Sequence, residues 1–108
     1  MGTMNNRRHK GTFHVGVCRA WLSMPENASL KDKRQILRSL IQKVRNKFDV
    51  AIAEVDAQDD WHLACIGISA VSGDPHHANE VLSKVVEFIE QSRSDAVLED
   101  YELEVQAW

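Results

Sequence analysis

The sequence predicts an α+β protein with a ferredoxin-like βαββαβ sandwich, in which a four-stranded antiparallel sheet (order 4-1-3-2) carries two helices on one face. Three observations support this prediction. Strand-like and helix-like segments follow one another in the order β-α-β-β-α-β. The length of 108 residues suits a single core. The first and third strand segments are apolar on both faces, as expected for the two central strands of this topology.

The N-terminal half supplies a tail, a strand and a helix. Residues 1–11 are polar and basic without periodicity, so we expect a flexible tail, followed by a single domain over residues 12–108. Residues 12–22, "TFHVGVCRAWL", form the first predicted strand. Ser29 and Asp32 have the spacing of a helix N-cap and capping box, and they predict a helix that ends near residue 47 or 48.

The C-terminal half supplies the other four elements. Residues 49–55 and 61–71 are strand-like and flank the turn-forming "DAQDD", which predicts a hairpin. Asp74, followed by proline, predicts the start of a second helix, which reaches residue 91 or 92. Residues 101–108, "YELEVQAW", alternate strictly and predict a half-buried edge strand with one acidic face.

The predicted sheet has one face without helices. Because the central strands are apolar toward both faces, either loops or another subunit must cover the second face. We expect a homodimer formed through the sheet.

Composition places the chain among ordinary globular proteins, with 44% hydrophobic and 27% charged residues. It contains no run of eighteen apolar residues, and its N-terminus lacks the apolar region of a secretory signal, so we expect a cytoplasmic protein without membrane contact. Cys18 and Cys65 form no CxxC pair and are expected to be free thiols in the core.

Charge is distributed unevenly along the chain. Residues 1–48 contain eleven Lys and Arg against two acids, and residues 49–108 contain two against fourteen, giving balances of +9 and −12. Such asymmetry suggests a nucleic-acid or other acidic partner. The alternative is that the two halves neutralise each other within the fold.

The segment "SLKDKRQILRSLIQKVRNKF", residues 29–48, contains seven of the thirteen Lys and Arg residues. On a helical wheel its leucines and other apolar residues form the core stripe, and Lys33, which lies inside that stripe, is expected to extend outward along the surface. Four cations lie within about 60° on one flank of the wheel. Arginine suits phosphate because its planar guanidinium donates two parallel hydrogen bonds. The candidate nucleic-acid contacts are Lys31, Arg34, Arg38 and Arg45, assisted by Arg7, Arg8 and Lys10 of the tail. The alternative is a solvated helix face whose cations pair with acids of the second half.

Other chemistries find little support in the sequence. The adjacent His76 and His77 point about 100° apart on a helix and cannot share a metal. His14 and His62 have no third group that would orient a base. The acids of residues 56–60 lack the pattern of a Ca²⁺ loop, and the third strand has no RNP1-like motif. We therefore expect no enzyme activity, no cofactor and no metal.

The string "SLKDKRQILRSLIQKVRNKF", with "DVAIAEVDAQDDW" and "ACIGISAVSGD" after it, resembles the YlxP-like family of small bacterial proteins, whose domain has no known function. The Ser-Leu-Lys-Asp-Lys-Arg string of residues 29–34 is the most specific part, and it is joined by Phe48, by residues 53–55 and by Trp61. The resemblance implies a ferredoxin-like fold and no catalytic residues. Genes of this family often adjoin those for transcription, translation and ribosome maturation, which implies a role near RNA or the ribosome.

The sequence thus predicts a non-enzymatic cytoplasmic module, associated with RNA or the ribosome through the basic flank of the first helix. The alternative is a dimeric protein-interaction or regulatory domain that acts through the open sheet face. Small-ligand binding in a dimer cleft is a weaker third option. Glu54, in an otherwise apolar strand, is expected to form an ion pair with Arg19 or Arg34.

Overall fold

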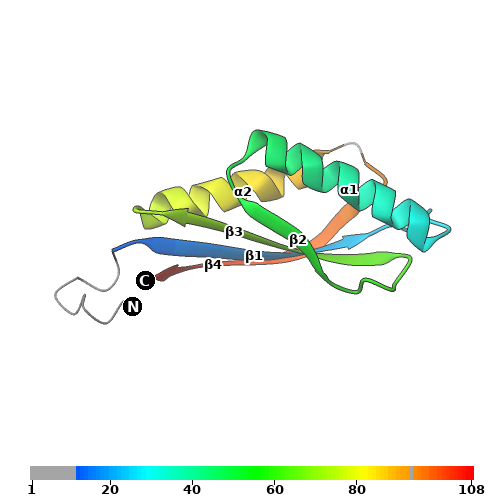
Figure 1. The fold of residues 1–108 in the computed structure, drawn as a ribbon, viewed down its shortest axis with the longest axis horizontal. Coiled ribbons are helices and arrows are strands. Elements are labelled where there is room, and N and C mark those ends of the chain that lie inside the picture. The colour runs from blue at the N-terminus through cyan, green and yellow to red at the C-terminus, as the bar shows by residue number, and fades with distance from the viewer. Residues whose placement is uncertain (1–11, 93) are drawn as a thin grey trace, which may run out of the picture.

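The computed structural model describes residues 12–92 and 94–108 and confirms the predicted α+β class (Figure 1). Four antiparallel strands form one sheet in the order β2-β3-β1-β4, which is the predicted order read from the other edge. Both helices lie on one face of this sheet (Figure 1). The tail residues Arg7, Arg8 and Lys10 lie outside the described residues. The elements are β1 (His14–Ser23), α1 (Leu30–Lys47), β2 (Ala51–Asp56), β3 (Leu63–Ser72), α2 (Pro75–Gln91) and β4 (Val97–Ala107).

Both helices begin at the predicted caps. The Ser29 hydroxyl accepts a hydrogen bond of 3.1 Å from the backbone N–H of Asp32. The Asp74 carboxylate accepts one of 2.9 Å from the N–H of His76, and α2 starts at the proline between them. These bonds satisfy N–H groups that have no partner inside the helix, which fixes where each helix starts.

The strand β4 begins four residues earlier than its alternating pattern predicts. Its register with β1 shifts between Trp21 and Leu22, where the ladder has an irregularity, and pairing then continues from Leu22 to Leu98. A bulge reverses the alternation of inward and outward side chains. The pattern of residues 97–100 alone therefore does not predict a strand.

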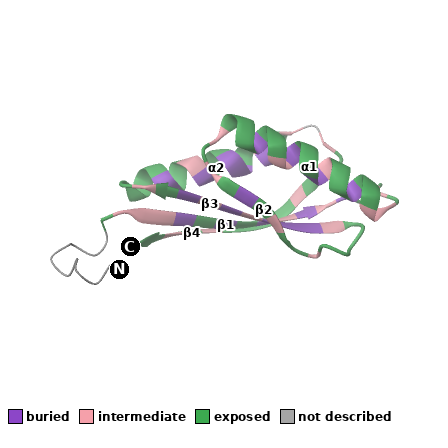
Figure 2. Ribbon diagram, viewed as in Figure 1, coloured by how far each residue is buried: buried purple, intermediate pink, exposed green. Residues whose placement is uncertain are grey.

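The core lies between the sheet and the two helices (Figure 2). Gly16 of β1 allows α2 to approach closely, since a Cβ at this position would lie 2.6 Å from Cδ1 of Leu82. Between the helices, the rings of Phe48 and Phe88 pack edge to face with centroids 5.7 Å apart. Fully buried side chains of the core include Leu22, Met24, Leu40, Val44, Ile66, Leu82, Val85 and Ile89.

No described element covers the second face of the sheet. Val17, Val55 and Val71 are 41%, 52% and 68% exposed. Large apolar side chains gathered on one sheet face are unusual for a surface that contacts only water. This surface is called the open face below.

Candidate nucleic-acid interface

The predicted basic flank lies along α1, where Lys31, Arg34, Arg38 and Arg45 are all exposed. The last three line a shallow groove of about 270 Å³ beside β2, which we call the arginine groove. Lys31 lies on the same helix but does not line this groove. The structure thus brings together three of the four cations that the sequence selected on α1. The groove is completed by Leu37, Ile41, Gln42 and Glu54.

The cations of this flank have no acidic partner among residues 12–92 and 94–108. The ion pairs there are Arg19–Glu102, Lys33–Glu54 and Lys84–Glu80, and none includes a candidate phosphate contact. Arg45 alone makes a polar contact with another element, as its guanidinium donates a hydrogen bond of 3.0 Å to the carbonyl of Ile52. In this part of the chain, the acids of the second half do not neutralise the row.

Lys33 does not extend outward as expected. Its side chain is 1% exposed, and its ammonium donates hydrogen bonds of 2.6 Å to the carbonyls of Ala57 and Asp60. The loop between β2 and β3 lies against this part of α1 and turns these carbonyls toward the lysine. A helical wheel places Lys33 in the apolar stripe but contains no information about the loop that meets it.

The prediction that Glu54 pairs with Arg19 or Arg34 is also wrong. Oε2 of Glu54 lies 3.1 Å from the ammonium of Lys33, whereas Arg19 pairs with Glu102. The reason is the strand period of two: Glu54 shares the helix-facing side of β2 with Ile52, while Arg19 projects from the open face. Arg34 lines the groove beside Glu54 without pairing with it.

This pairing decides the charge of the arginine groove. Glu54 lies in the lining, where an unpaired carboxylate would offset one arginine. The buried ammonium of Lys33 compensates that carboxylate, so the pair contributes no net charge. Three guanidinium groups therefore give the groove a balance of +3.

The β2–β3 loop is held at the same end of the molecule by further contacts. The amide of Asn27 donates hydrogen bonds to the carbonyls of Trp61, at 2.6 Å, and Ser29, at 2.8 Å. Ala57 adopts the left-handed conformation with φ 60°, which is uncommon for a residue with a Cβ. Trp61, which belongs to this loop, is 48% exposed.

Three further features considered in the sequence are metal binding, the two cysteines and membrane contact. No three His, Cys, Asp or Glu side chains gather there as a metal-binding group. Both cysteines are free and buried; burial raises the pKa of Cys18 to about 11 and raises that of Cys65 as well. Neither described helix is long and apolar enough to span a bilayer.

The comparison with known proteins decides the family. Residues 15–103 match the model of a protein family of unknown function, DUF503. The chain belongs to the DUF503 family. It is similar to the uncharacterized protein YlxP of Bacillus subtilis strain 168, with 40% identity over 76 residues, which are 70% of this chain and 83% of that protein. The resemblance to YlxP-like proteins is thus confirmed.

In this DUF503 protein, the first two of the strings that carry the resemblance meet at one place. Ser29 caps α1, Lys33 pairs with Glu54, and Lys33 also binds the carbonyl of Asp60, which precedes Trp61 in the loop between β2 and β3. The sequence contains one signal of this arrangement: a lysine inside an apolar stripe, together with a glutamate inside an apolar strand.

Proposed function

We propose that this protein is a non-enzymatic cytoplasmic module that associates with RNA or the ribosome through its arginine groove. The observation that carries the proposal is that Arg34, Arg38 and Arg45 line one groove and have no acidic partner among the described residues. Guanidinium groups bind phosphate oxygens through charge-assisted hydrogen bonds, and a basic row on a rigid helix fits a phosphate backbone.

The length of the basic row on α1 limits the number of phosphates that it can contact. From Lys31 to Arg45 the helix rises by about 21 Å, at about 1.5 Å per residue. Four cations in this distance correspond to three or four phosphates. For that number, the logarithm of the binding constant should fall with the logarithm of the salt concentration with a slope of about −2 to −4.

The test is a titration of labelled structured and single-stranded RNA at several salt concentrations. We expect the double variant Arg34→Glu/Arg38→Glu to abolish binding at low salt. The matched control is Lys43→Glu/Lys84→Glu, which makes the same charge change at exposed positions outside the groove. The proposal fails if wild type does not bind at low salt, or if the two double variants weaken binding equally.

The tail cations Arg7, Arg8 and Lys10 are part of this proposal as additional phosphate ligands. A protein that begins at residue 12 should then bind RNA with a smaller salt slope than the full chain. For each phosphate that the shortened protein no longer neutralises, the slope should decrease in magnitude by about 0.7 to 0.9. An unchanged salt slope would show that the tail does not contact phosphate, and the proposal would then rest on the arginine groove alone.

A second candidate function is a dimeric protein-interaction or regulatory domain that acts through the open face. The specific observation in its favour is the exposure of Val17, Val55 and Val71 on the face that lacks helices. Sedimentation of the protein after nuclease treatment separates this function from RNA-mediated association. Assembly that survives nuclease supports it, and a monomer at all concentrations contradicts it.

A further inference from the structure

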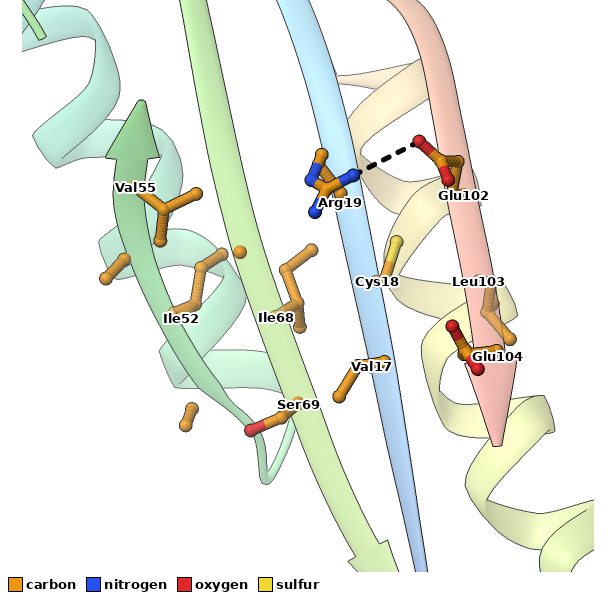
Figure 3. A pocket seen from close by; sticks show the side chains of 13 residues that line it. Val17, Cys18, Arg19, Ile52, Val55, Ile68, Ser69, Glu102, Leu103 and Glu104 are labelled. Atoms are coloured by element: carbon orange, nitrogen blue, oxygen red, sulfur yellow. Dashed lines mark hydrogen bonds and ion pairs between the residues drawn. The ribbon is translucent and has the colours of Figure 1, made fainter. Parts of the chain in front are cut away.

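Across the middle of the open face, β2 and β3 carry small side chains and β1 and β4 carry large ones. Figure 3 shows Val17 and Arg19 on β1, and Glu102 and Glu104 on β4. Antiparallel pairing puts residues of neighbouring strands into rows that cross the sheet, with all members of a row on one face. One row runs Ala51, Ser69, Val17, Glu104, and the next runs Ala53, Gly67, Arg19, Glu102. In both rows β2 and β3 contribute the small residues, and β1 and β4 contribute the large ones.

This difference leaves a hollow on the open face. A shallow cavity of about 550 Å³ is lined by residues of both rows. Val55 lies at the edge of the hollow, with Cγ1 2.9 Å from where a Cβ on Gly67 would be. The residues of β2 and β3 beneath it, such as Ala51 and Ser69, have no side chain long enough to fill it.

We propose that a second copy of this chain docks on the open face, with a two-fold axis along the boundary between β1 and β3. In the two rows described above, this rotation places the large side chains of each copy on the small side chains of the other. Val17 then meets Ser69 of the second copy, and Glu104 meets Ala51. At one end of the face, the exposed Val71 meets Val15, which is its partner in the β1–β3 register.

Charge distinguishes this axis from its main competitor. An axis perpendicular to the strands would stack β4 on β4 and bring Glu102 and Glu104 of both copies together. The proposed axis instead puts the two β4 strands at opposite edges of the dimer. They are then separated by three strand spacings, about 14 Å, which exceeds the Debye length of about 8 Å at physiological salt. Repulsion between the acidic β4 strands therefore favours the proposed axis, which is also the axis that places large side chains on small ones.

The size of the face predicts how strong this dimer is. The strands β1, β2, β3 and β4 are 10, 6, 10 and 11 residues long, which gives a flat area of about 600 Å² for each copy. Stable interfaces bury about 800 Å² for each partner, so this dimer is smaller than a standard interface and belongs with the weak ones. We expect it to dissociate on dilution through micromolar concentrations.

The arrangement has a consequence for the candidate RNA contact. With the two sheets face to face, α1 and α2 of each copy lie on the outside (Figure 1). The dimer then carries two arginine grooves on opposite outer surfaces. This consequence rests on the proposed function of the arginine groove, whereas the dimer rests only on the open face.

The first test measures mass in solution. Light scattering or sedimentation equilibrium should give twice the chain mass of 12.3 kDa at high concentration. Ser69→Arg, which fills the hollow, should give a monomer. Ser83→Arg makes the same change at an exposed position of α2 and should leave the dimer intact. A wild-type monomer at several hundred micromolar overturns the proposal, as does a Ser69→Arg variant that is folded and dimeric.

The second test identifies the axis by crosslinking with a short bismaleimide. A mixture of Glu104→Cys and Ala51→Cys proteins should link, because the rotation brings these positions together. In the proposed dimer the two copies of position 104 lie at opposite edges, at least three strand spacings or about 14 Å apart, as do the two copies of position 51, so each variant alone should not form a dimer band. Wild type is the control, since its two cysteines are buried. Linking of Glu104→Cys to itself would overturn the proposed axis. RNA binding is measured separately, so failure of one proposal does not affect the other.

Discussion

The ammonium of Lys33 lies 3.1 Å from the carboxylate of Glu54, which lines the arginine groove, and the Lys33 side chain is almost completely shielded from water. The same ammonium donates to two carbonyls of the β2–β3 loop, at 2.6 Å each. One side chain of α1 therefore fixes both an acid of β2 and the loop that follows it. The contact sets the charge of the groove and the position of its neighbouring loop.

Replacing Lys33 with methionine should strongly destabilise the protein. The substitution keeps an unbranched side chain in the core but leaves the Glu54 carboxylate without its cation and the Ala57 and Asp60 carbonyls without their donor. Removing one partner from a fully buried ion pair costs about 3–5 kcal/mol, and because the remaining Glu54 side chain is 21% exposed we expect the lower end of this range. Urea unfolding of wild type and variant measures this free-energy difference directly.

Two further variants distinguish the effect of breaking the ion pair from the effect of losing a lysine side chain. Lys31→Met changes an exposed lysine two residues away and should alter stability by less than about 0.5 kcal/mol. Lys33→Met/Glu54→Gln should be more stable than Lys33→Met, because no buried charge remains unpaired. If the double variant is less stable than Lys33→Met, the carboxylate is not what makes the single substitution costly.

Most of the fold is predictable because its signals are local. Ser29 and Asp74 mark the helix starts by hydrogen bonds within a few residues of each cap. Strand order follows from which strands are apolar on both faces. The start of β4 is not predictable in this way, because the irregularity at Trp21 and Leu22 depends on the neighbouring strand and leaves no alternation in the segment itself.

The candidate site is predictable only in part. The helix period alone places Arg34, Arg38 and Arg45 on one flank, and the structure agrees. Burial of Lys33 and its choice of Glu54 depend on where the β2–β3 loop folds, which is a contact between segments more than twenty residues apart. The hollow on the open face likewise arises from the register of four strands. Periodicity within one element contains none of this information.

Within the arginine groove, Arg38 and Arg45 should respond differently to truncation. Arg45→Ala removes a hydrogen bond to the Ile52 carbonyl and should cost about 1 kcal/mol of stability. Arg38 has no ion pair among the described residues, so Arg38→Ala should change stability by less than about 0.5 kcal/mol. Both should weaken RNA binding if the proposed function is right. Thermal unfolding and RNA titration of the two variants give the comparison, and equal stability would show that the Arg45 bond contributes nothing.

Two glycines provide a matched test of the packing between α2 and β1. Gly16→Ala puts a methyl group 2.6 Å from Cδ1 of the fully buried Leu82, and overpacking of this kind should cost about 1–2 kcal/mol. At Gly73 an added Cβ meets nothing within 4 Å, so Gly73→Ala should be neutral or stabilise by about 0.5 kcal/mol. Denaturant midpoints measure both. Equal midpoints for the two variants would mean that α2 shifts away from β1 without penalty.

Burial of Cys18 should make stability fall in alkaline solution. Burial raises the pKa of its thiol from 9.0 to about 11. Above pH 9 the unfolded chain releases this proton while the folded protein keeps it, so the unfolded state binds fewer protons and stability decreases as pH rises. The stability that the protonated Cys18 thiol contributes is complete below pH 9, the pKa of the unfolded chain. It is lost progressively as the pH rises toward the folded-state pKa.

The Cys18→Ala variant isolates this effect, since every other titrating group is common to both proteins. The stability difference between wild type and variant should be constant from pH 7 to 8.5 and should shift against wild type between pH 9 and 11. Alkylation gives an independent measurement: because the thiolate is the reactive form, iodoacetamide should modify the folded protein slowly at pH 8 and the urea-unfolded chain rapidly. Rapid modification of Cys18 in the folded protein at pH 8 would contradict the raised pKa and the close packing of β1 that causes it.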